Sequence, residues 1–414
     1  MITFISLRYL IAHARQSIIC VAGVAISVAM FIAMTSMMGG FTDKFIIETV
    51  ESTGHITIHD EPRQSDTPIL EANYPAGGVL VLSGPKPRDT VEKIKNPTGL
   101  MAELTRLPGI VSASATVSGD AIVTYGTKTA TTAVIGIDPP KHLSVTTIGD
   151  DLTAGNFGRL QTTADGVVLG WGLASLVGAR LDDTITLSSP TGGKTTGRVV
   201  GIFQTGVTPV DYGRAYMLLS DAQTLLDKKN IVNEIVMRTT DYTQAREVAA
   251  QIEGICGYKT ESWQESNANF LKIFRIQTII TYIITGALMI VAAFGVLNIL
   301  IMAVLERVND IAILKSFGLS RNDITRIYLI QGLVIGLIGS TVGLACGKLA
   351  VETLRRIPIQ MEGLVKAEGL LMSEHRENYI FSFVASIVIV MIAAVYPARR
   401  AAKFDPVEVI RGSR

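Results

Sequence analysis

The hydrophobic residues of this chain gather in four long segments, at positions 17–39, 276–305, 327–350 and 379–396. A helix needs about 20 apolar residues to cross the hydrocarbon core of a bilayer. Each segment is therefore predicted to be a transmembrane helix. The first follows two arginines, as a signal peptide would, but its apolar core is longer than the roughly 7 to 15 residues of a secretory signal. We expect an uncleaved membrane anchor there.

The distribution of Lys and Arg predicts which connections face the cytoplasm, because cytoplasmic loops are enriched in these residues. They are concentrated in the N-terminal segment 1–16 and in the C-terminal tail 397–414. Both termini are thus predicted to be cytoplasmic, and so is the segment 306–326. Residues 41–270 then form a large domain outside the membrane, and residues 351–378 form a short outer loop.

Between the first two membrane segments, the pattern indicates a mixed α+β domain. GHITIHD alternates like a strand, and helix-then-strand patterns occur in TGLMAELTRLPGIVSASATV and YTQAREVAAQIEGICGYKT. Shorter strand signals fill the middle of the domain, which predicts an inserted β-rich subdomain. Residues 61–97 hold six of the 14 prolines and are expected to form a long loop.

Two predicted stalk helices join this domain to the membrane segments. FTDKFIIETVES continues the first segment, and KTESWQESNANFLKIFRIQ leads into the second. Aromatic side chains lie on these stalks, where an apolar substrate could contact them. Packing of the domain onto the membrane explains their spacing equally well. The candidates for substrate contact are Phe41, Phe45, Trp263, Phe270 and Phe274.

Composition and motifs exclude several classes of function. Hydrophobic residues make up 48% of the chain, and the mean hydropathy of +0.39 is too high for an ordinary soluble protein. A net charge of +1 argues against a nucleic-acid partner held by a basic surface. GGKT at 192–195 lacks the first glycine of a phosphate-binding loop and is expected to be a hairpin turn. His55 and His59 lack a third metal ligand, so neither a metal site nor a catalytic site is predicted.

A charged stretch, ERVNDIAILKSFGLSRNDITRI, separates the second and third membrane segments. Its apolar positions have helical spacing, and Gly318 is the residue type that helix ends prefer. Ser320 and Asp323 signal the start of the next helix. We therefore expect a short helix rigidly joined to two membrane helices. A simple anchor in the membrane interface is the alternative, although the acidic residues Glu306 and Asp310 weigh against it.

At these residues the sequence resembles a known family. MAVLERVNDIAILKSFGLSRNDITRIYLIQGLVIGLIGSTVGLACG is similar to the connecting loop and third membrane helix of the MacB-type (type VII) ABC transporter permeases. YPARRAAKFDPVEVIRG is similar to their C-terminal signature. GGFTDKFIIETVESTGHITIH and DGVVLGWGLASLVGARLDDTITL are most similar to the lipoprotein-releasing (LolC/LolE) group. The resemblance covers nearly the whole chain except residues 61–97. It implies an outer domain with a porter part, at about 50–120 and 225–262, interrupted by a sabre part at about 121–224.

The resemblance also implies partners. The short helix would be a coupling helix that docks on a cytoplasmic ABC ATPase dimer, which binds ATP and Mg while this chain binds no cofactor and catalyses nothing itself. A second permease, either a copy or a relative, a periplasmic acceptor or fusion protein, and membrane lipid complete the expected partners. Asp310 stands where the family more often has glutamate. The coupling candidates are Glu306, Arg307, Asp310, Lys315, Gly318 and Arg321.

Glycines in the third membrane segment step along one helical face. Small residues let membrane helices approach closely, so this face is a candidate for contact with a second permease. Packing within one subunit explains the same pattern nearly as well. The helix-packing candidates are Gly332, Gly336, Gly339, Gly343 and Gly347.

The function implied is extraction or export of an amphiphile, most specifically a lipoprotein, from the outer leaflet of the plasma (inner) membrane. Efflux of a small hydrophobic molecule such as a drug, haem or peptide is one alternative. Signalling of the FtsX type to an extracytoplasmic hydrolase is another. The long outer region at 41–270 makes the signalling alternative the less favoured of the two.

Overall fold

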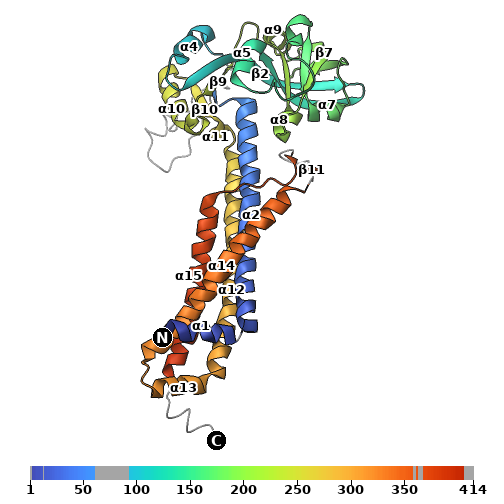
Figure 1. Ribbon diagram of the computed structural model, residues 1–414. Coiled ribbons are helices and arrows are strands. Elements are labelled where there is room, and N and C mark those ends of the chain that lie inside the picture. Colours follow the sequence, from blue (N-terminus) through green and yellow to red (C-terminus); the bar gives the residue numbers. More distant parts are fainter. Residues whose placement is uncertain (1, 13, 61–92, 358–359, 362–366, 405–414) are drawn as a thin grey trace, which may run out of the picture. The chain divides into compact units, whose positions relative to one another are not determined.

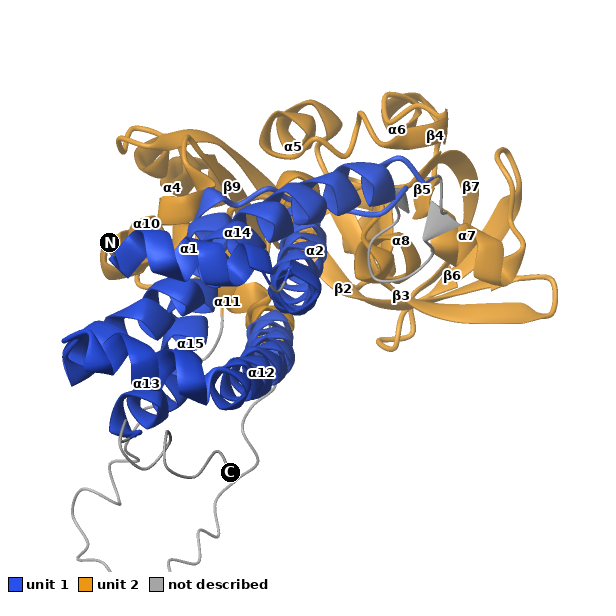
Figure 2. Cartoon of the chain, turned by 60° about the horizontal axis from the view of Figure 1, so that its bottom comes forward, with its two compact units in different colours: residues 1–44, 272–361, 367–414 blue, residues 45–271, 362–366 orange. Residues whose placement is uncertain are grey.

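The computed structural model describes residues 2–12, 14–60, 93–357, 360–361 and 367–404. The chain divides into two compact units, shown in different colours in Figure 2. The first comprises residues 1–44, 272–361 and 367–414, and the second comprises residues 45–271 and 362–366. Most of the predicted proline-rich loop, at residues 61–92, lies outside the described residues, and so does the end of the predicted tail.

The membrane unit contains the four predicted apolar helices, which confirms the predicted fold class. They are α2 (Ala14–Thr53), α12 (Ala268–Glu306), α14 (Arg321–Arg355) and α15 (Arg376–Lys403). Each helix contains a predicted membrane segment and extends beyond it (Figure 1). The first predicted stalk continues α2 without a break. The second is interrupted: its start forms β10 and the short helix α11, Asn267 ends α11, and α12 begins at Ala268. The boundary between the two units falls inside α2 and α12.

The N-terminal segment forms a helix of its own, α1 (Ile2–Ala12). The Ser6 hydroxyl donates a hydrogen bond of 3.1 Å to the carbonyl of Ile327 and so ties α1 to α14. Phe4, Leu7 and Ile11 recur every three or four residues and are exposed. Such a stripe is typical of a helix that lies in the membrane interface.

Beyond α14 the chain returns across α2. It forms the short strands β11 (Gln360–Met361) and β12 (Ala367–Glu368), which pair antiparallel. The backbone N–H of Ser373 then donates to the carbonyl of Ser36 at 2.9 Å. A Cβ atom at Gly40 would lie 2.5 Å from the backbone of Leu371, so only glycine allows this crossing.

The outer unit is built on one mixed sheet with the strand order β10-β1-β9-β2-β3-β8-β5-β7-β4, and β6 pairs with β2 and β7 (Figure 1). The strands are β1 (Ile56–His59), β2 (Ile110–Tyr125), β3 (Lys128–Ile137), β4 (Leu152–Gly155), β5 (Gly166–Gly170), β6 (Thr184–Ser188), β7 (Lys194–Phe203), β8 (Arg214–Leu218), β9 (Glu234–Thr239) and β10 (Lys259–Ser262). The helices are α4 (Pro97–Leu104), α5 (Pro139–Val145), α6 (Arg159–Thr162), α7 (Trp171–Val177), α8 (Thr208–Gly213), α9 (Leu219–Leu225), η1 (Tyr242–Gln244), α10 (Ala245–Cys256) and α11 (Trp263–Ser266).

The long strand β2 joins two parts of this unit. Its residues up to Thr116 pair with β9, whereas those from Val117 pair with β3. The part of the unit that pairs with the start of β2 has one apolar core, around Ile58, Leu104 and Met237. The β-rich part, which pairs with the end of β2, has a second core around residues such as Val167. The division predicted at 120/121 thus falls within a single strand, which carries the sheet from one core to the other.

The GGKT sequence forms the predicted hairpin turn. Strands β6 and β7 pair antiparallel up to Ser188 and Lys194. The backbone N–H of Ser189 donates to the carbonyl of Gly193 at 2.8 Å, and Gly192 adopts a φ of 96°, which favours glycine. This geometry closes a turn between two strands rather than opening a phosphate-binding loop before a helix.

His142, on α5, should make the unfolding free energy of the outer unit decrease in acid. Burial and, secondarily, the charge of Arg214 lower the pKa of its imidazole to about 4. In the unfolded chain a histidine has a pKa of about 6.5, so the unfolded state binds more protons between these values and stability falls as the pH drops through this window. The wild type should lose about 2 kcal/mol of unfolding free energy through this residue between pH 7 and pH 4.5.

His142→Phe should abolish that part of the loss. Both tryptophans, Trp171 and Trp263, belong to the outer unit, so their fluorescence during unfolding reports on it. Equal pH dependence of the unfolding free energy in the wild type and the variant would contradict the prediction.

Candidate functional site

The short connecting helix forms as predicted and is fixed at both ends. Helix α13 spans Val308–Ser316, and Gly318 beyond it adopts a φ of 96°. Ser320 then caps α14: its hydroxyl accepts from the N–H of Asp323, and the Asp323 carboxylate accepts from the N–H of Ser320 at 3.0 Å. Helix α13 is therefore held between α12 and α14 by short, defined turns (Figure 1).

Two of the six coupling candidates turn inward. The Lys315 ammonium donates to the carbonyls of Ala402 and Phe404, both at 2.7 Å, at the end of α15. The Arg307 guanidinium lies over the ring of Tyr9, 4.0 Å from its centroid. These contacts attach α13 to the helix bundle. The predicted coupling role of the two residues stays a prediction.

Acids and large apolar side chains are exposed together on α13 and at its two ends: Glu306 ends α12, Asp310 and Ile313 lie on α13, and Phe317 directly follows it. Glu306, Asp310, Ile313 and Phe317 are spaced by three or four residues and are all exposed, Phe317 to 83%. Gly318 and Arg321 are exposed beside this stripe. The four stripe residues are called the α13 face below.

Sequence analysis missed Ile313 and Phe317. The available signal was helical phase, because both lie on the side opposite Ile311 and Ala312, which are buried. An exposed apolar side chain as large as Phe317 fits either a partner surface or the membrane interface, the two alternatives that the sequence offered.

The stalk aromatics pack against one another. The rings of Phe41 and Phe274 meet edge to face at 5.6 Å in the membrane unit. In the outer unit the rings of Phe45 and Phe270 lie 5.4 Å apart. The Trp263 indole N–H donates to the carbonyl of Tyr242 at 2.8 Å.

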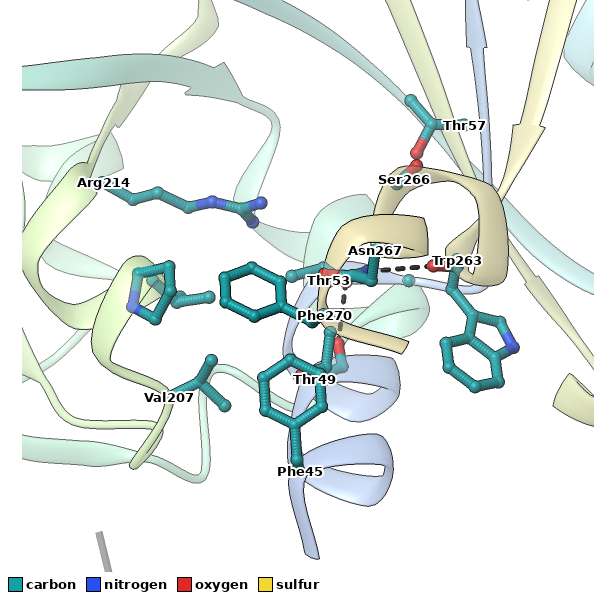
Figure 3. Close-up of a pocket in the computed structure, with 13 residues that line it drawn as sticks. Phe45, Thr49, Thr53, Thr57, Val207, Arg214, Trp263, Ser266, Asn267 and Phe270 are labelled. Atoms are coloured by element: carbon teal, nitrogen blue, oxygen red, sulfur yellow. Dashed lines mark hydrogen bonds between the residues drawn. The ribbon is translucent and has the colours of Figure 1, made fainter. Parts of the chain in front are cut away.

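Three of the five predicted substrate contacts, Phe45, Trp263 and Phe274, are buried. They cannot offer an open apolar surface in this conformation. Their contacts are those of the alternative that the sequence offered, in which the aromatic rings pack within the protein. Phe45, Trp263 and Phe270 also line a pocket of the outer unit, drawn in Figure 3.

An apolar hollow of about 220 Å³ lies in the membrane unit, on the outer-loop side of α2 and α12. Phe41 is the one predicted substrate contact that lines it. Sequence analysis missed the rest of its wall because the outer loop supplies part of it. The remaining lining residues are Met37, Met38, Gln277, Leu370 and Leu371.

The glycine face of α14 is occupied within the chain. A Cβ atom at Gly339, Gly343 or Gly347 would lie 2.7 to 2.9 Å from side-chain atoms of α2. A Cβ atom at Gly332 would lie 2.6 Å from that of Ala394 on α15, and Gly336 also faces α15. These contacts are the packing within one subunit that the sequence offered as one alternative. The other alternative, contact of this face with a second permease, stays a prediction.

These features define a class of protein with four helices long enough to cross a membrane, a large outer domain and a short helix that connects two of the four. Residues 17–255 match the MacB-like periplasmic core domain, and residues 282–406 match the FtsX-like permease C-terminal family. The first match covers more than half of the chain. The chain belongs to the MacB-like family of ABC transporter permeases, which places it in the inner membrane with a periplasmic domain.

Relatives along nearly the whole length carry lipoprotein-releasing names. The chain is 26% identical to the lipoprotein-releasing system transmembrane protein LolC of Neisseria meningitidis, over 99% of this chain and 98% of the relative. It is 24% identical to LolE of Haemophilus influenzae, over 98% of each. The macrolide export ATP-binding/permease protein MacB of a Shewanella strain is 25% identical over 74% of this chain and 47% of the relative.

The glycine contacts predict that replacing glycine by alanine changes the stability of the protein by an amount that depends on the position along α14. Gly343→Ala would place a Cβ atom 2.7 Å from Val28 Cβ and 2.8 Å from the carbonyl oxygen of Ala25. Such overpacking should destabilise the protein by about 1 to 3 kcal/mol. Gly336→Ala is the matched control, because its Cβ atom would meet Ile387 at an ordinary 3.6 Å.

The control variant should be as stable as the wild type or more stable, since alanine favours helix. Thermal unfolding in detergent, followed by helical circular dichroism, measures both. Equal melting temperatures for the two variants would show that the α2–α14 contact is not close.

Proposed function

We propose that this chain is the permease subunit of a transporter that extracts lipoproteins from the outer leaflet of the inner membrane, driven by a separate ATPase dimer. The observation that carries the coupling step is the α13 face, which presents two acids and two large apolar side chains on a helix that is fixed to the bundle. The cargo is proposed from the lipoprotein-releasing relatives that match the chain end to end.

Coupling requires that the ATPase can push on the permease without deforming it. Phe317 and Ile313 supply the apolar centre of the proposed contact, and Glu306 and Asp310 supply its charged part. Interfaces are commonly organised around such an aromatic anchor with charges around it. Lys315, which donates to two carbonyls of α15, passes displacement of α13 on to that helix.

The cargo's acyl chains set the second requirement. Each methylene exposed to water costs about 0.8 kcal/mol, so a lipidated protein leaving the membrane needs an apolar surface along its route. The hollow lined by Met37, Phe41 and Leu371 is the candidate entry point, because five of its six lining side chains are apolar.

The proposal has further parts, which the resemblance to the lipoprotein-releasing relatives supports. ATP and Mg bind to the ATPase dimer, and this chain contributes no catalytic residue. Both termini and α13 face the cytoplasm. A second permease, identical or related, completes the path, and a periplasmic acceptor receives the cargo from the outer domain.

Disrupting the α13 face should weaken capture of the ATPase without unfolding the permease. Phe317→Ser removes the exposed anchor, and Asp310→Lys reverses a charge beside it. Each change should reduce co-purification of the ATPase subunit by about tenfold or more. Asn322→Ser, exposed on the first turn of α14 but outside the face, is the control and should behave as wild type.

Quantitative co-purification from membranes that contain equal amounts of permease provides the measurement. Undiminished capture in both face variants would leave α13 as an interfacial anchor.

The apolar hollow should contact lipidated cargo directly. A photoreactive side chain at Met37, which lines the hollow, should crosslink to a lipoprotein in the absence of ATP. The same group at Ile290, exposed on α12 away from the hollow, should not. A cargo variant without acyl chains should lose the Met37 product.

Crosslinking at both positions or at neither would contradict the proposal that the cargo enters through the hollow. Persistence of the Met37 product with the unacylated cargo would contradict recognition of the acyl chains.

A further inference from the structure

The outer unit contains a recess that sequence analysis did not foresee. Two hollows, of about 180 and 200 Å³, share four lining residues: Thr53, Thr57, Arg214 and Ser266. They are therefore neighbours with a shared wall around Arg214, and the two together are called the recess below. Its walls come from the last turns of α2, from β1, from the α8–β8 segment and from α11. Figure 3 shows the first of the two hollows.

Arg214 brings an unmatched charge into this recess. It is the first residue of β8, where pairing with Ala133 fixes its backbone, and its side chain reaches in among the lining residues (Figure 3). In the described part of the chain the guanidinium makes no ion pair with a carboxylate. Burial raises the pKa of the neighbouring Tyr216 phenol despite the opposing effect of Arg214, so Tyr216 stays neutral and cannot balance the charge. A guanidinium offers five N–H donors, and leaving them without an acceptor in a half-buried site is unfavourable.

Buried polar atoms without partners lie at both ends of the recess. His142 is buried, and neither ring nitrogen has a hydrogen-bond partner among the described residues. Thr49 Oγ1, in the other hollow, is also buried and unpaired. Nearly all such atoms in folded proteins are paired, so the recess offers these two residues as further polar groups that a bound molecule could satisfy.

Glu234 is the acid of the recess whose charge acts on Arg214, but the two form no ion pair. Glu234 lines the second hollow, but burial raises the pKa of its carboxyl, and its carboxylate lies 4.0 Å from His59. His59 Nε2 lies 3.6 Å from Glu261 on its other side. Because these acids share His59, Arg214 remains the charge without a direct carboxylate partner.

The first hollow adds an apolar wall. Phe45 and Phe270 form one side, and the side chains of Val207, Pro209 and Val210 form another. Thr53 and Ser266 add hydroxyl groups to the lining of the same hollow. A ligand that satisfies the whole recess therefore needs an oxyanion at one end and an apolar substituent at the other.

We propose that this recess binds a small amphiphilic anion, with a carboxylate or phosphate group held by Arg214 and an apolar chain lying on Phe270 and Pro209, which are not fully buried. Arginine binds carboxylate and phosphate through two parallel hydrogen bonds, which suits a single residue acting alone. The site belongs to the outer unit and does not depend on which cargo the transporter moves. Its ligand is either a free alkyl carboxylate or phosphate, or the headgroup region of an anionic lipid.

The recess has its own optical reporter. Trp263 lines the first hollow, and the chain has two tryptophans, so Trp171→Phe leaves Trp263 as the single fluorophore. The full chain in nanodiscs of neutral lipid is titrated with hexyl phosphate, hexanoate and dihexanoyl phosphatidylglycerol. Inorganic phosphate and hexan-1-ol are titrated separately, each as one half of the proposed ligand.

Hexyl phosphate should give a saturable change in Trp263 fluorescence, at concentrations about tenfold or more below those needed for inorganic phosphate or hexan-1-ol. Tighter binding of dihexanoyl phosphatidylglycerol than of hexanoate would identify a lipid headgroup as the source, and the reverse order would identify a free alkyl anion.

Arg214→Gln should weaken binding of hexyl phosphate about tenfold to a hundredfold, whereas Arg214→Lys should retain part of it. Arg106→Gln removes an exposed arginine elsewhere in the same unit and should change nothing. An Arg214→Gln effect no larger than that of Arg106→Gln overturns the proposal.

The ligand titrations in the Trp171→Phe protein test the proposed site even if the Arg214→Gln variant does not fold. Equal responses to hexan-1-ol and hexyl phosphate would overturn the anion site. Equal responses to inorganic phosphate and hexyl phosphate would overturn the apolar part.

Discussion

The close approach of α14 to its neighbours is the contact on which the membrane unit depends. In a bilayer, lipid tails are as apolar as leucine, so helices associate through fit rather than through escape from water. Glycines on α14 provide that fit: Val24, Val28 and Ile32 of α2 fill the space next to Gly339, Gly343 and Gly347. On the α15 side, the Ser340 and Ser386 hydroxyls meet at 2.7 Å and satisfy each other in the interior. Helix α14 is therefore the element that fixes both α2 and α15.

This arrangement gives α13 a rigid foundation. Gly318 and the Ser320 cap allow a sharp turn directly into α14, and Lys315 binds the end of α15. A force on the α13 face therefore acts on two packed helices at once. Interdigitated interiors transmit displacement because they deform little. The same features that stabilise the bundle thus suit the helix for coupling to an ATPase.

Local features were predictable from sequence because they depend on neighbouring residues. The four apolar helices, the stop at Gly318, the start at Ser320 and the turn at Gly192 all follow from periodicity, capping and turn chemistry. Long-range contacts were not predictable. Nothing in the local sequence around Lys315 indicates the carbonyl acceptors at Ala402 and Phe404.

Features that depend on tertiary arrangement were also missed. The recess around Arg214 needs residues from α2, α8 and α11, which are far apart in the sequence. The stalk aromatics show a second limit of prediction from sequence. Helical spacing identifies a shared face, but it does not say whether a ring on that face meets a substrate or another ring. The pairing of Phe45 with Phe270 decides the question for this conformation.

The central claim is that the α13 face lies in the cytoplasm, on the opposite side of the membrane from the outer domain. Single cysteines at Ser316 and at Thr127, both exposed, in a protein lacking Cys20, Cys256 and Cys346, test it most directly with a membrane-impermeant maleimide on spheroplasts. The account predicts labelling at position 127 in intact spheroplasts and labelling at position 316 only after the membrane is permeabilised. Labelling at position 316 in intact spheroplasts would contradict it, because an ATPase in the cytoplasm could not reach the α13 face.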